Sequence, residues 1–479
     1  MGFDIYLRLR AAHAGRAERL CARRHVHLSQ WPLVVVGYHL AGEPGAPVAL
    51  RYGSRPDDSH TLVVPEPRDR TLRFARLARF AADLARYLDR FSRRAPVPSG
   101  APGGSGSGSV CVDAPQLLCP NAATAQWLTD ALGRQLRYLR PDGPHPVDPS
   151  LPTAGAHLTF FAEQRVLPGS CLVLTATELL TTHWCTGQLP VEDQHLGAVL
   201  AWVDPPAGTT GPEAALVAEQ QPPAGPLSDP AWDRERLQPL IGEYARAGEA
   251  GPAVEAELAQ ECADVLEQAW QDTWRARDLV AALPEAAHVP QRWDQDRRAW
   301  TRHLDRVVAG TANFRIRQDQ LRSFRFLHEL ERRTVALARQ MALDDPVRLA
   351  AQVAAGDALA GEVVERDCAH RIASTSGRRR LVRPLLRLRP VVPFHRPAGT
   401  ELWWTDNTRV RVEIRSVDDG GVVELMVVAG ANRSVEEAER TLPAPGARMA
   451  FVDSDEDRFP DVLPERLPWT HEPAGEEEP

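Results

Sequence analysis

The spacing of apolar residues changes near residue 360, and this change constrains the fold more than any other feature of the 479-residue chain. From 232 to 360 apolar residues recur every three or four positions, which is typical of amphipathic helices. From 361 to 453 they alternate with polar residues, which is typical of strands with one buried face. The sequence therefore predicts a helical stalk or bundle followed by a small β-barrel of the OB or SH3 type.

The first part of the chain predicts two more folded units. Over 1–95, three short strands precede an amphipathic helix at 71–94, which indicates an α+β unit. Over 110–204, strands alternate with helices, which indicates an α/β unit. Its short strands are expected at 115–119, 158–161 and 170–174. The fold class is therefore multidomain α+β, within the two to four domains that this length favours.

Three segments have the composition of linkers or tails. Residues 96–109 are rich in Gly, Ser and Pro, and residues 205–231 are rich in Pro, so both are expected to link folded units. Residues 454–479 are Pro-rich and acidic, and we expect this tail to be disordered.

The chain contains no lysine, because all 56 of its Lys and Arg residues are Arg. A P-loop, a protein kinase site and imine catalysis each need a Lys, so the sequence excludes all three. Arginine binds phosphates bidentately and stacks on flat rings, but it cannot act as an amine nucleophile. A nuclease of the common restriction type is also disfavoured, since its carboxylates usually work with a Lys.

Cysteine use and hydropathy suggest a location. The seven cysteines have no regular spacing, which favours free thiols in a reducing cytoplasm. We find no secretory signal and no apolar run long enough for a membrane helix, so we expect a cytoplasmic chain without a membrane partner. No cofactor is expected.

The predicted barrel is the main candidate for binding. Residues 378–415 contain ten Arg and three acidic residues, which predicts a positive outer face. Barrels that bind single-stranded nucleic acid combine such charge with aromatic rings on which bases stack. The candidate residues on the barrel are Arg383, Arg387, Arg389, Arg411, Arg415, Trp403 and Trp404. Arg322 and Arg325, on the helix that precedes the barrel, are expected to contact phosphates as well.

The α/β unit offers an alternative site. Glu192, Asp193 and His195 can supply acid–base chemistry, which would make this unit a hydrolase, although the sequence pairs them with no nucleophile. A capped helix start explains the two carboxylates better, because their negative charge favours the positive N-terminal end of a helix. Cys171, His183, Cys185 and His195 are ligand types for zinc, but their spacing matches no zinc pattern, so we predict no metal site.

Long helices followed by a small barrel, over about residues 250–450, resemble the stalk-and-barrel accessory insert of UPF1-type superfamily 1 helicases. The resemblance rests on architecture, and the chain has no motor motif. It implies a partner or accessory of a motor that another chain supplies.

The sequence thus predicts a non-catalytic protein that binds nucleic acid, mainly single-stranded, and assists an ATP-driven, helicase-like partner. The alternatives are the α/β hydrolase and a scaffold without a nucleic-acid role, in which the acidic tail covers the basic barrel.

Overall fold

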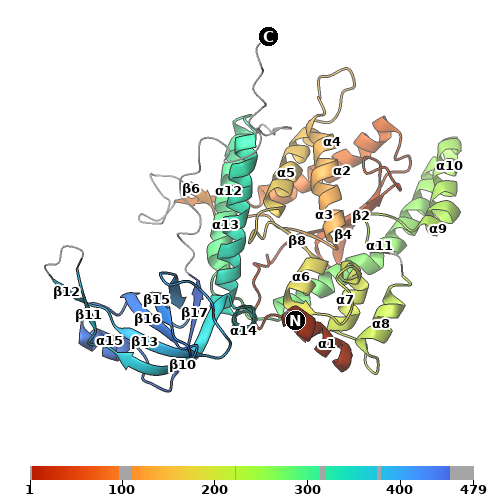
Figure 1. Cartoon of the computed structure of the whole chain (residues 1–479). Coiled ribbons are helices and arrows are strands. Elements are labelled where there is room, and N and C mark those ends of the chain that lie inside the picture. Colours follow the sequence, from red (N-terminus) through yellow and green to blue (C-terminus); the bar gives the residue numbers. More distant parts are fainter. Residues whose placement is uncertain (1–2, 97–108, 222, 313–319, 375–378, 454–479) are drawn as a thin grey trace, which may run out of the picture. The chain divides into compact units, whose positions relative to one another are not determined.

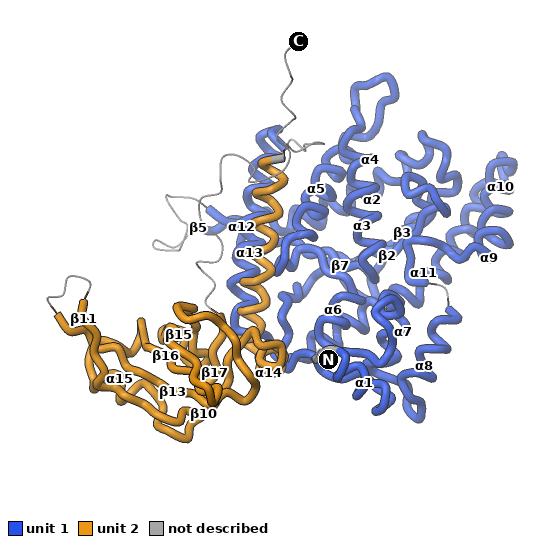
Figure 2. The backbone as a smooth tube through the Cα atoms, in the orientation of Figure 1, with its two compact units in different colours: residues 1, 3–314 blue, residues 2, 315–479 orange. Residues whose placement is uncertain are grey.

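The computed structural model describes residues 3–96, 109–221, 223–312, 320–374 and 379–453 (Figure 1). Helices and strands are mixed, and the C-terminal region holds a closed barrel, so the predicted fold class is confirmed. The chain divides into unit 1, residues 3–314, and unit 2, residues 315–479 (Figure 2). The linker predicted at 96–109 lies outside the described residues, apart from its two ends, and so does the tail predicted at 454–479.

A five-stranded sheet forms the centre of unit 1, in the order β4-β3-β2-β7-β8. Its strands are β2 (Leu33–His39), β3 (Pro47–Arg55), β4 (Asp58–Val63), β7 (Leu117–Cys119) and β8 (Val173–Thr175). The first three form an antiparallel meander, and β7 joins β2 in parallel. The segments 1–95 and 110–204, predicted as separate units, therefore contribute strands to one sheet.

Helices cover both faces of this sheet. On β3, Arg51 forms an ion pair with Glu267 of α11 (Gly251–Ala281), whereas the next residue, Tyr52, donates a 2.6 Å hydrogen bond to Asp83 of α2 (Arg70–Asp89). Successive strand residues point to opposite faces, so α11 and α2 lie on opposite sides of the sheet. Because β2 is covered on both faces, all seven of its residues are buried.

Further helices and two small sheets complete unit 1. The helices are α1 (Phe3–Ala14), α3 (Ala122–Gln126), α4 (Gly133–Arg137), α5 (Ser150–Arg165), α6 (Ala176–His183), α7 (Leu196–Val203), α8 (Gly211–Ala218), α9 (Pro230–Trp232), α10 (Gln238–Arg246) and α12 (Val289–Val308). The small sheets pair β1 (Glu18–Arg19) with β9 (Trp184–Cys185), and β5 (Arg94–Pro96) with β6 (Ser109–Cys111). A π-helical segment, Trp127–Leu132, joins α3 to α4.

The expected strand at 158–161 is wrong, because these residues lie inside α5. A short, mostly apolar run fits a buried helix as well as a buried strand, and here Leu158, Phe160 and Phe161 are all buried in the core of unit 1. Asn121 caps α3, since its side chain accepts a hydrogen bond from the backbone N–H of Thr124.

Unit 2 consists of helices and a barrel with a short hairpin. The helices are α13 (Gln320–Asp344), α14 (Pro346–Ala355) and the short α15 (Val435–Thr441). The closed barrel has the order β10 (Ala358–Asp367), β13 (Leu385–Pro390), β16 (Val423–Ala429), β15 (Arg411–Val417), β14 (Glu401–Trp404) and β17 (Arg448–Asp453). The hairpin pairs β11 (Arg371–Ala373) with β12 (Arg380–Val382). The helical range predicted at 232–360 is therefore divided, with α11 and α12 in unit 1 and α13 and α14 in unit 2.

The alternation of apolar and polar residues correctly predicts which side chains of the barrel strands are buried. Val412 and Ile414 of β15 are buried, as are Leu386 and Leu388 of β13, while the intervening Glu413 and Arg387 lie outside. In the part of the chain that the structure describes, every helix is too short or too polar to cross a membrane.

Close packing of α4 on α5 gives a first prediction. A Cβ at Gly155 would lie 2.2 Å from the backbone nitrogen of Arg137, so alanine cannot fit without moving α5. Gly155→Ala should lower the free energy of unfolding by about 1–3 kcal/mol, measured by urea denaturation. The control is Gly242→Ala in α10, where the nearest atom is 4.0 Å away and alanine should stabilise by about 0.5–1 kcal/mol. Equal effects of the two variants would contradict the packing.

A buried histidine pair gives a second prediction. His157 Nδ1 and His303 Nε2 are 3.0 Å apart, among Trp300 and Phe160. Burial lowers the pKa of His157 to about 4 and that of His303 to about 2, so both rings are neutral in the folded protein. An unfolded chain protonates them near pH 6.5, so unfolding takes up protons below that pH.

The free energy of unfolding should therefore be highest above about pH 7. It should fall as the pH drops from 6.5 toward 4, by at most about 1.4 kcal/mol per pH unit for each imidazole. Urea denaturation across this range measures the slope. The double variant His157→Gln, His303→Gln should flatten it, whereas His13→Gln, at an exposed position on α1, should leave it unchanged. A slope that survives the double variant would refute the assignment.

Candidate functional site

Three of the predicted barrel arginines are paired with acidic residues. Arg387 contacts Glu365 at 3.3 Å and Asp418 at 2.7 Å. Arg411 contacts Glu401 at 3.2 Å, and Arg415 contacts Glu413 at 3.3 Å. Most of these acids come from neighbouring strands or turns, so reading one strand at a time overstated the positive charge. This part of the barrel surface carries mixed charge.

A second group of arginines lies open on the β11–β12 hairpin. Arg371, Arg379 and Arg380 are exposed, and the strand pairing holds them on one small ribbon. Within the described ranges, neither Arg379, Arg380 nor the exposed Arg389 of β13 forms an ion pair. We call Arg371, Arg379, Arg380 and Arg389 the open arginines. The predicted Arg383 is half-buried, and its guanidinium donates to the carbonyl of Val382.

Neither predicted tryptophan is an open stacking platform. Trp404 points into the barrel and is only 8% exposed. Trp403 points outward and packs with residues of α13 and α14, where the Arg339 guanidinium lies 4.4 Å from its ring centre. One face of Trp403 is therefore covered within unit 2, and the ring helps to hold the helices against the barrel. Neither ring is thus fully open to a stacking base.

On α13, the predicted Arg322 and Arg325 are exposed near the N-terminal end of the helix. Further along the same helix, Glu329 forms ion pairs with Arg332 and Arg333. Arginines in the middle of α13 are thus neutralised by an acid of the same helix, much as those on the barrel are by acids of neighbouring strands.

In unit 1, the three residues of the alternative acid–base site do not act together. Asp193 is buried, where its carboxylate accepts hydrogen bonds from Thr186 and Gln188 and contacts Arg8 of α1 at 3.1 Å. Glu192 is exposed and accepts from the backbone N–H of Leu189. Both carboxylates are therefore explained by local structure, which leaves His195 alone as a candidate.

The cysteine and histidine side chains considered as zinc ligands also have other contacts. His183 Nδ1 donates to the carbonyl of Leu179, and its Nε2 accepts from the backbone N–H of His25. Cys171 Sγ accepts from the backbone N–H of His27. Among the described residues, Cys171, His183, Cys185 and His195 do not converge within ligand distance of one another.

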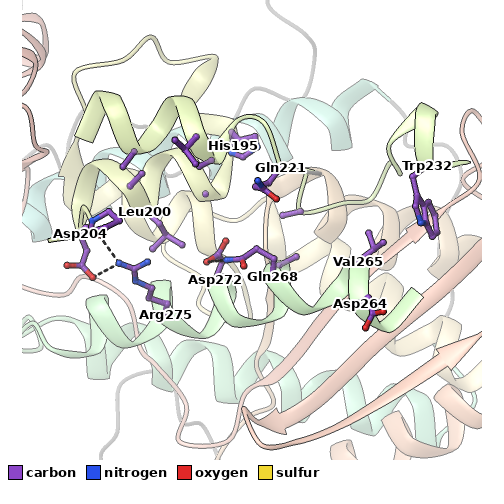
Figure 3. A pocket seen from close by; sticks show the side chains of 18 of the residues that line it. His195, Leu200, Asp204, Gln221, Trp232, Asp264, Val265, Gln268, Asp272 and Arg275 are labelled. Atoms are coloured by element: carbon purple, nitrogen blue, oxygen red, sulfur yellow. Dashed lines mark hydrogen bonds and ion pairs between the residues drawn. The ribbon is translucent and has the colours of Figure 1, made fainter. Parts of the chain in front are cut away.

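His195 instead lines an open cavity of about 580 Å³ in unit 1 (Figure 3). It caps α7, since its Nδ1 accepts from the backbone N–H of Ala198. Across the cavity, Gln268 and Asp272 extend from α11 toward the side of His195 and Gln221, as Figure 3 shows. Sequence reasoning missed the α11 residues, because a carboxylate on a long helix usually marks a solvated face.

The electrostatics of this cavity are set mainly by carboxylates. Asp204 is neutralised by Arg275, with 2.6 Å between Oδ2 and Nη2. Burial raises the pKa of Asp272, while the hydrogen bond from Gln268 and the charges of Arg275 and His195 lower it in part. At one end, Glu261 forms an ion pair with Arg236, and that interaction lowers the pKa of Glu261. Among the described residues, Asp264 and Asp272 form no ion pair, although Arg275 and His195 lie close enough to Asp272 to lower its pKa.

Comparison with known proteins gives no further guidance: no family model, no curated protein and no solved structure matches the chain. The function has to be argued from the geometry.

The contacts of Asp193 give a third prediction. Asp193→Ala should lower the free energy of unfolding of unit 1 by about 1–3 kcal/mol, because it removes a buried acceptor that Thr186, Gln188 and Arg8 share. Glu192→Ala, at an exposed position one residue away, should cost less than about 1 kcal/mol. Thermal and urea denaturation compare the two. An Asp193→Ala variant of unchanged stability would reopen the acid–base alternative.

Proposed function

We propose that unit 2 binds nucleic acid through the open arginines of the barrel, and that the chain is not itself a catalyst. The observation that supports this is that the exposed guanidinium groups of Arg379, Arg380 and Arg389 form no ion pair among the described residues. An unpaired guanidinium is free to bind a phosphate bidentately, whereas a paired one must first lose its carboxylate.

The binding is proposed to be directed to phosphates rather than to bases. Trp404 is buried and Trp403 is covered on one face, so base stacking contributes little. Leu381, next to Arg380, is 37% exposed, but it is aliphatic and offers no ring for a base to stack on. We therefore expect little sequence specificity and only a modest preference for single strands over duplexes, together with a steep dependence on salt.

An ATP-driven, helicase-like partner remains part of the proposal, on the resemblance to a stalk-and-barrel insert. Within unit 2, one 25-residue helix, α13, precedes the barrel and is joined to it by α14. Arg322 and Arg325 near the start of α13 can extend the phosphate contacts of the barrel. The partner is proposed to supply the motor, because the chain has no lysine for a P-loop.

The fourth prediction separates open from paired arginines. In fluorescence anisotropy with labelled oligonucleotides, the triple variant Arg379→Ala, Arg380→Ala, Arg389→Ala should bind at least about 10-fold more weakly at low salt. The slope of log affinity against log salt should become smaller by about 0.9 for each phosphate that the variant no longer neutralises. The matched control removes the paired residues, Arg387→Ala, Arg411→Ala, Arg415→Ala, and should change the affinity by less than about 3-fold.

Equal weakening in the two triple variants would mean that net charge alone matters and would refute the assignment to the open arginines. Absence of binding by the unaltered chain at low salt would refute the function and favour the scaffold.

A further inference from the structure

The cavity of unit 1 has one polar side and one apolar side. Its polar side is a row on α11, where Asp264, Gln268 and Asp272 follow at four-residue steps and therefore share one face of the helix. Its apolar side is formed mainly by residues of α7 and α8 and includes Leu200, Ala201, Ala214, Val217 and Ala218. Such a combination suits a ligand with both polar groups and an alkyl chain.

The carboxylates in the row have acceptor capacity to spare. Asp264 Oδ1 accepts from Gln260 at 2.8 Å, and Asp272 Oδ1 accepts from Gln268 at 2.9 Å. Among the described residues, the second oxygen of each carboxylate accepts no hydrogen bond. Asp272 is also half-buried, and a partly desolvated carboxylate is stabilised by a cation that enters the cavity.

The distance between Asp264 and Asp272 determines which cations can contact both carboxylates. Residues eight apart on an α-helix are about 12 Å apart along its axis at a rise of 1.5 Å per residue. A compact metal ion cannot contact both Asp264 and Asp272 at that distance. A linear chain with an ammonium group near each end can, while its methylene groups lie against Leu200 and Val217. At the far end of the cavity, the ion pair of Arg275 with Asp204 limits its length.

We propose that this cavity is a binding site for a linear aliphatic polyamine of the spermidine class, bound along α11 between Asp264 and Asp272. This site is independent of the open arginines, since it lies within unit 1 and recognises a cation rather than a phosphate.

The fifth prediction tests the site by isothermal titration calorimetry of the full chain, freed of nucleic acid, with spermidine as the probe. The double variant Asp264→Asn, Asp272→Asn should weaken spermidine binding at least about 10-fold, because it removes both negative charges that face the ammonium groups. The matched control removes two other acids from the same helix outside the cavity, Glu257→Gln and Asp278→Asn, and should change binding by less than about 2-fold. Val217→Arg, which places a cation at an exposed position of the lining, should also block binding without altering the core.

Competition by other cations shows whether the cavity recognises the length of spermidine or only its positive charge. Butylammonium should bind much more weakly than spermidine because it has one charge, and millimolar Mg²⁺ should compete poorly because it cannot span the row. Thermal denaturation of each variant with and without spermidine checks that it is folded and reads binding independently. Equal weakening by both double variants, equal competition by Mg²⁺, or no binding by the unaltered chain would each overturn the proposal.

Discussion

Unit 1 depends on the coverage of its central sheet by α11. Strand β2 is buried along its whole length, so it requires helices on both faces. One of them, α2, comes from the same part of the sequence, but α11 begins more than 200 residues after β2 begins. Tyr38 of β2 donates a hydrogen bond to the carbonyl of Cys262 on α11, and Trp270 of the same helix is fully buried.

The position of α11 also creates the cavity. One side of this helix covers the sheet with Leu258, Cys262, Leu266 and Trp270, all of which are buried. Another side presents Asp264, Gln268 and Asp272 to the cavity. A helix that must be apolar on its sheet side is free to be polar on the other, and α7 and α8 enclose that polar side with small and aliphatic residues. The coverage of the sheet and the polar side of the cavity therefore both depend on α11.

In unit 2 the pairing of the barrel strands decides which charges are available. The pairing of β10 with β13 brings Glu365 beside Arg387, and that of β14 with β15 brings Glu401 beside Arg411, so these outward arginines are neutralised by their neighbours. The β11–β12 hairpin is outside the barrel order, and its Arg379 and Arg380 form no ion pair among the described residues. The order of the strands, rather than the number of arginines, thus decides which guanidinium groups are neutralised. Counting arginines in the sequence therefore overestimates the positive charge of the barrel surface.

The sequence by itself determined the features that depend on the spacing of residues close together in the chain. Patterns within a few residues predict the apolar stripe of α2, the alternation of buried Val412 and Ile414 with outward polar residues, and the mixed fold class with its barrel. The chemistry excluded by the missing lysine is equally independent of the fold.

Only the tertiary structure decided which distant residues meet. It joined β7 to β2 in one sheet, placed residues 158–161 in a helix, turned Asp193 into the buried partner of Arg8, and brought His195 to the cavity lined by Asp272. These outcomes depend on burial and charge pairing between segments far apart in the chain, and a local pattern contains no information about its partner. The sequence therefore limited the possible chemistry, and long-range packing decided where each site lies.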